Sequence, residues 1–207
     1  MAMMLIAGCG ASAGALEGHS ADGEYRGPDD LFRVDVPRMR NPFIKEPSEI
    51  RDRRRPDGGA EVTFSVAELG EAWRFGVRSF ALGADSMAAV CDEELERWQP
   101  APGAPEILLE EEFQHDAGPA LTRIYHVESA SLLFVRQGEG PAGRASALIG
   151  VVVVQTAQAG PVLYAVGQFD MPNRGGHYTL ETERGRQKLA AQQLKRLREL
   201  SASLRLQ

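Results

Sequence analysis

Cysteine is scarce in this sequence, and long hydrophobic runs are missing from it. Only two of the 207 residues are cysteines, and a Cys9–Cys91 disulfide is not expected because it would tie down a polar, glycine-rich tail. The longest apolar run in the body, residues 147–154, has the length of a strand and falls far short of the roughly 20 residues of a membrane-spanning helix. The net charge of −6 argues against nucleic acid as a partner, because phosphate binding needs a concentrated basic surface.

The usual catalytic motifs are absent too. The sequence contains no G-x-S-x-G, H-E-x-x-H or C-x-x-C pattern and no phosphate-binding glycine loop with its lysine. His115 and His126 are expected opposite Ala120 and Leu109 on paired strands, about 20 Å apart, which is too far to share a metal ion. His177 falls in a polar loop and is expected to be solvated. We therefore predict no catalytic residues, no cofactor and no metal site.

The first short apolar run ends in LIAGCG, residues 5–10. Its tetrapeptide Ile6-Ala7-Gly8-Cys9 resembles the lipobox of bacterial lipoproteins, in which a peptidase cuts before the cysteine and the sulfur carries a lipid such as palmitate. The resemblance implies that residues 1–8 are the remnant of a signal peptide, that Cys9 is lipidated, and that residues 9–23 are a flexible tether. It also implies a place in the bacterial cell envelope, and Gly10 after the cysteine favours the outer membrane, facing the periplasm.

One feature of this segment departs from a signal peptide. No lysine or arginine precedes Cys9, whereas signal peptides begin with a basic region. Two alternatives stay open: a true start upstream of Met1, or a disordered N-terminus whose cysteine is unmodified.

Residues 24–207 carry regular patterns of a single domain. Alternating apolar residues predict strands, and Gly/Pro-rich stretches separate them. Helical spacing predicts a helix over 85–98, with Asp85 or Ser86 as its N-cap, and an amphipathic helix over 180–204. The predicted strands cover residues 24–37 in two pieces, 60–69, 72–80, 106–115, 120–129, 146–156 and 161–170. A loop is expected over 38–59. Strand 146–156, apolar on both faces, is expected inside the sheet.

Runs of strands with isolated helices indicate an α+β domain. We expect an antiparallel β-sheet of about six to seven strands covered by two helices. This order resembles the PsbP-like fold, named after an extrinsic subunit of photosystem II and shared with a nuclear-import factor that binds the GTPase Ran. The likeness rests on FRVDVP (32–37), on the helix that follows a strand pair, and on LRELSASL at 197–204. It implies a binding or assembly role.

A basic cluster stands out within this acidic chain: Arg51, Arg53, Arg54 and Arg55. We predict that it is a mobile surface loop and a possible partner-binding site for an acidic protein or for lipid head groups. The leading hypothesis is a non-catalytic, lipid-anchored cell-envelope protein that binds another protein of the envelope. The alternatives are a periplasmic enzyme whose site uses His177 and the arginine cluster, and a cytoplasmic GTPase-binding module.

Overall fold

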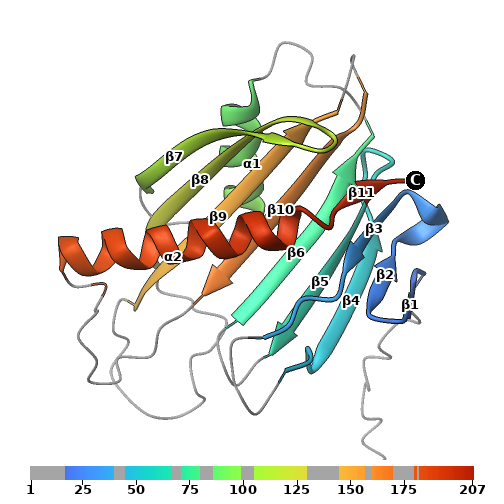
Figure 1. Ribbon diagram of the computed structural model, residues 1–207, viewed down its shortest axis with the longest axis horizontal. Coiled ribbons are helices and arrows are strands. Elements are labelled where there is room, and N and C mark those ends of the chain that lie inside the picture. The colour runs from blue at the N-terminus through green and yellow to red at the C-terminus, as the bar shows by residue number, and fades with distance from the viewer. Residues whose placement is uncertain are drawn as a thin grey trace, which may run out of the picture.

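A computed structural model describes residues 17–39, 45–66, 71–79, 86–98, 105–129, 145–156, 160–169, 180 and 182–207. Within them lie two antiparallel sheets and two α-helices (Figure 1), which confirms the predicted α+β class. The elements are β1 (His19–Ala21), β2 (Glu24–Arg26), the short 3-10 helix η1 (Pro28–Asp30), β3 (Phe32–Asp35), β4 (Glu49–Arg54), β5 (Ala60–Val66), β6 (Glu71–Arg78), α1 (Met87–Trp98), β7 (Glu106–His115), β8 (Gly118–Ser129), β9 (Ala145–Gln155), β10 (Val162–Phe169), α2 (Glu183–Ser201) and β11 (Arg205–Leu206).

The larger sheet has seven strands in the order β4-β5-β6-β10-β9-β8-β7. Five of its six neighbouring pairs join strands that are consecutive in the sequence, and the sixth pair, β6 with β10, joins the two halves of the sheet. Strand β9 lies inside the sheet between β10 and β8, as its apolar sequence predicts. Alternate residues of β9 point to opposite faces of the sheet, and both sets are buried, so each face packs against a different layer.

One helix covers each face of the larger sheet, with α2 in front of it and α1 behind it in Figure 1. On the α1 face, Val90, Cys91 and Leu95 of the helix are buried against strands β8, β9 and β10. Ser86 caps α1 by accepting a hydrogen bond from the Ala89 N–H at 3.2 Å, which confirms one of the two predicted caps. On the α2 face, Leu197 packs into a second core that includes the smaller sheet.

The C-terminal helix is shorter than predicted. Helix α2 runs from Glu183 to Ser201, whereas the periodicity predicts a helix over 180–204. Thr182 caps its first turn through a hydrogen bond from the Gly185 N–H. Beyond Ser201 the chain turns into β11, which pairs with β3, and Leu204 between them is fully buried. The apolar residue that seemed to extend the helix thus belongs to the turn after it.

The smaller sheet has the order β1-β2-β3-β11 and begins before the predicted domain boundary at Glu24. Strand β1 pairs with β2, and the Gly18 N–H donates to Asp52 of β4 at 2.7 Å. The hydroxyl of Tyr25, a fully buried residue, also donates to Asp52. Residues 17–23 were expected to be tether, but these bonds attach them to the domain. Residues 1–16, with Cys9, lie outside the described residues.

Candidate functional site

The four arginines of the basic cluster lie on an ordered strand and its turn, not in the predicted mobile loop. Strand β4 pairs with β5 along its whole length. The half-buried Ile50 lies opposite the buried Phe64. The charged residues of β4 are tolerated because the strand is at the edge of the sheet. Successive side chains on a strand point to opposite faces. The pairing therefore sends Arg51 and Arg53 to the α1 face and Arg54 to the α2 face.

The cluster is consequently split among three environments. Arg51 and Arg53 have side chains that are 76% and 63% exposed. Arg54 forms ion pairs with Glu17 and Asp29 near the smaller sheet. Arg55 is buried, which the sequence prediction of a solvated cluster missed.

Arg55 belongs to a buried ion network between α1 and strands β5, β6 and β10. Its Nη1 lies 2.9 Å from the Glu94 carboxylate of α1 and 2.8 Å from the Tyr164 hydroxyl of β10. The network consists of Arg55, Glu61, Arg74, Glu94, Arg97 and Tyr164. Four of these charged residues are buried, two cations and two anions, so their charges balance. Such balance is what allows ionised groups to remain in an interior.

Glu61 is the centre of the network, and the exposed fraction of this residue is only 2%. Its carboxylate lies 3.1 Å from Arg97 Nη2 and 2.5 Å from Arg53 Nε, and it accepts a hydrogen bond from Tyr164. Burial alone would raise the pKa of Glu61, but Arg74, Tyr164 and further arginines lower it to about 2. Burial and the nearby Glu61 carboxylate raise the pKa of Tyr164. Glu61 is therefore an anion and Tyr164 a neutral donor at neutral pH.

This network supports a polar surface on the α1 face of strands β4 and β5, which we call the arginine face. It consists of Arg51 and Arg53 with the half-exposed Thr63 and Ser65. Register places Arg51 beside Thr63 and Arg53 beside Glu61. Helix α1 packs on β8, β9 and β10, so within the described residues no helix covers the arginine face (Figure 1). Its two arginines are cationic hydrogen-bond donors, which suits binding of an anionic group.

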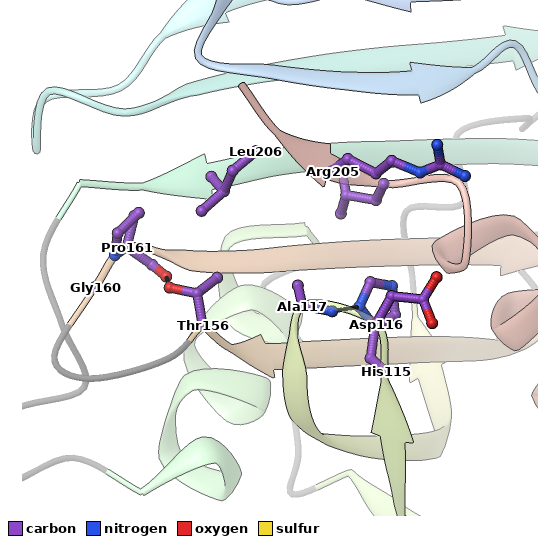
Figure 2. Close-up of a pocket in the computed structure, with 9 residues that line it drawn as sticks. His115, Asp116, Ala117, Thr156, Gly160, Pro161, Arg205 and Leu206 are labelled. Atoms are coloured by element: carbon purple, nitrogen blue, oxygen red, sulfur yellow. Dashed lines mark hydrogen bonds between the residues drawn. The ribbon is translucent and has the colours of Figure 1, made fainter.

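A second candidate is a pocket of about 480 Å³, shown in Figure 2, between the β7–β8 turn, the facing ends of β9 and β10, and β11. His115 lies in its wall, where Nδ1 accepts a hydrogen bond from the Ala117 N–H and Nε2 donates to the Ser201 carbonyl. Both ring nitrogens are engaged, so the histidine links the turn to the end of α2. The Thr156 hydroxyl likewise donates to the Pro161 carbonyl. Among the described residues that line the pocket, the side chains of His115 and Thr156 are therefore engaged in holding the fold.

The histidines on the β7–β8 hairpin do not approach each other. His115 pairs with Gly118 and His126 with Glu106, so they lie near opposite ends of the hairpin. The predicted partners were Ala120 and Leu109. The register differs because the turn contains only two residues and a bulge follows Ile107. Within the described residues no group of three or more potential metal ligands occurs. His177 lies outside those residues.

Sequence reasoning missed Glu61, Arg74 and Glu94, and one signal could have found the last. Val90, Cys91 and Leu95 share one face of α1, and Glu94 lies on that face at helical spacing. A charge in an apolar stripe requires a buried partner. Glu61 and Arg74 carry no such signal, because they alternate with apolar residues as solvated strand residues do.

Comparisons with known proteins bear on the fold. No family model matches the sequence, and no curated protein matches it. Solved structures do match. The Saccharomyces cerevisiae Ran-binding protein Mog1p is 15% identical, with a TM-score of 0.52 over 88% of this chain and 94% of that one. A mutant of the protein Mog1 is 13% identical, with a TM-score of 0.51 and the same coverage.

The chain shares the fold of Mog1p. The match extends over nearly the whole of both chains, so the two sheets and two helices form one common architecture. The resemblance to the photosystem II subunit is not tested by these structures and remains a prediction. Among the described residues, no helix is both long enough and apolar enough to cross a membrane.

Proposed function

We propose that this chain is a non-catalytic protein-binding module and that its partner is a small GTPase. The observation that carries the proposal is the match along nearly the full chain to two Mog1 structures, one of them described as a Ran-binding protein. The arginine face supports the binding part of the proposal, because Arg51 and Arg53 present exposed donors on an ordered strand.

The test is direct binding to small GTPases encoded in the same genome. Each GTPase is prepared nucleotide-free, with GDP and with a non-hydrolysable GTP analogue, and its association with the immobilised chain is measured by biolayer interferometry. We expect at least one GTPase to bind with an affinity that depends on its nucleotide state. Failure of every GTPase in all three states, with a chain whose circular dichroism shows it folded, would overturn the proposal.

A second proposal, about location, competes with a cytoplasmic GTPase as the partner. The tetrapeptide Ile6-Ala7-Gly8-Cys9 supports a lipid-anchored protein of the cell envelope, in which the binding partner belongs to the same compartment. A protein carrying a lipid at Cys9 would be attached to a membrane without a spanning helix. Binding to a cytoplasmic GTPase and export to the envelope exclude each other, so the fate of Cys9 discriminates between the two compartments.

A further inference from the structure

We propose that the arginine face is the docking surface of this module and that Arg51 and Arg53 bind side-chain carboxylates of an acidic segment on the partner. This inference rests on the proposed function only in that the chain binds a protein. Arg51 and Arg53 are separated by one residue on β4, so their Cα atoms lie about 7 Å apart along the strand. That is also the repeat of alternate side chains on an extended partner segment.

The buried network orients the side chain of Arg53. Its Nε lies 2.5 Å from Glu61, and Glu61 is in turn fixed by Arg97 and by Tyr164. The described residues provide no hydrogen bond to the two terminal nitrogens of Arg53. A guanidinium held at Nε on a side chain that is 63% exposed can bind a carboxylate through two parallel bonds from its terminal nitrogens.

Arg51 is the more adaptable of the pair. Among the described residues it bonds to Glu49 on the same strand, with Nη2 and Nε at 2.5 and 2.7 Å from the Glu49 carboxylate. Because both side chains are exposed, this ion pair contributes little and can be exchanged for a partner carboxylate. Ser65 lies opposite Glu49 and donates its hydroxyl to the same carboxylate at 3.4 Å, whereas the half-exposed Thr63 lies opposite Arg51.

The geometry favours an acidic protein segment over a single phosphate group or a membrane. A phosphate requires donors that converge on one centre, whereas the arginine face spreads its donors over two adjacent strands. A membrane surface attracts clusters of basic residues, but this chain carries a net charge of −6. Carboxylates spaced along an extended chain match both the separation of the arginines and their planar guanidinium groups.

The probe is a fluorescein-labelled ten-residue peptide that alternates glutamate with serine, and the control peptide alternates glutamine with serine. Fluorescence anisotropy at low salt measures binding to the wild type and to the Arg51→Gln/Arg53→Gln variant. We expect the glutamate peptide to bind in a salt-sensitive manner and the double variant to weaken its binding about tenfold or more.

Two further variants separate docking from folding. Arg54→Gln removes one positive charge on the opposite face, against two in the double variant, and should alter affinity less than about twofold. Glu49→Gln removes the competing carboxylate and should tighten binding, by up to about fivefold. Equal weakening by Arg54→Gln, or weaker binding by Glu49→Gln, would overturn the proposal.

The outcomes also distinguish this inference from the proposed function. If a GTPase binds the wild type and the double variant equally, the proposed function is supported and the assignment of the arginine face as the docking surface is refuted. If the glutamate peptide binds as expected but no GTPase binds, the arginine face is supported as a docking surface and the GTPase proposal is refuted. Binding of vesicles containing phosphatidylserine in place of the glutamate peptide would overturn the choice of an acidic protein segment.

Discussion

Replacing Glu61 by glutamine should destabilise the domain strongly at neutral pH. The substitution preserves the size of the side chain but removes the negative charge that faces Arg53, Arg74 and Arg97. It also turns an amide donor toward groups that are themselves donors. The buried arginines would then share a single buried carboxylate, Glu94.

Two independent routes give the magnitude. The pKa of Glu61 is about 2 in the fold against its ordinary value of 4.5, and this difference corresponds to about 3 kcal/mol of stabilisation at pH 7. Removing one partner of a buried ion pair typically costs about 3–5 kcal/mol. We expect Glu61→Gln to lose an amount in this range, which is a large part of the 5–15 kcal/mol typical of a folded domain.

The effect has a defined pH dependence. A carboxyl group whose pKa is lowered by folding contributes its full stability above its unfolded pKa and loses it as the pH falls through the folded value. The difference between wild type and Glu61→Gln should therefore be constant above about pH 5 and shrink between pH 4.5 and 2.

Urea denaturation followed by circular dichroism at pH 7, 4 and 3 measures this difference, and Glu112→Gln, at an exposed residue, is the control. A loss below about 1 kcal/mol at pH 7 would refute the reasoning. So would a difference that stays unchanged down to pH 3.

Three further predictions concern other parts of the chain. A Cβ added at Gly167 would lie 2.0 Å from the ring of the fully buried Trp73, so Gly167→Ala should cost about 1–3 kcal/mol or more; an unchanged melting temperature would contradict the close packing of β6 on β10. Cys91 is fully buried and burial raises its pKa, so in a Cys9→Ser background a thiol reagent should label it only in denaturant; rapid labelling of the native protein would count against this. Expressed with its upstream codons, the wild type should enter the detergent phase with acyl mass on its N-terminal peptide, and Cys9→Ser should stay in the aqueous phase; equal partitioning would remove the support for lipid anchoring.

Strand β5 was predictable from the sequence because its buried residues alternate with more polar ones. In β5, Val62, Phe64 and Val66 are buried and the residues between them are more polar, so period-two alternation identifies the strand. Strands β1 and β11 have three and two residues, which is too short for any periodicity. They exist because pairing partners are brought to them by the rest of the chain.

The arginine cluster shows the limit of local reasoning. Four basic residues within a polar segment predict a solvated loop, and for Arg51 and Arg53 the exposure is indeed high. Arg55 differs because it pairs with Glu94 of α1, which lies about 40 residues later in the sequence. No local pattern contains that contact, so neither the burial of Arg55 nor the order of the segment could be inferred from it.

The two buried carboxylates provide a way to separate the stability of the fold from the docking of a partner. Glu61 contacts Arg53 directly, whereas Glu94, which is fully buried, contacts Arg55, Arg74 and Arg97. Glu94→Gln should therefore destabilise the domain by an amount similar to Glu61→Gln, about 3–5 kcal/mol.

Only Glu61→Gln should also weaken binding of the glutamate peptide under conditions where both variants are folded, because only Glu61 holds the guanidinium of Arg53 in place. Denaturation curves and peptide anisotropy measured on the same samples make the comparison. If both variants lose peptide affinity to the same extent, the orientation of Arg53 does not depend on Glu61 and the arginine face is not preorganised by the network. If Glu61→Gln alone loses affinity, one buried carboxylate both stabilises the domain and orients its docking residue.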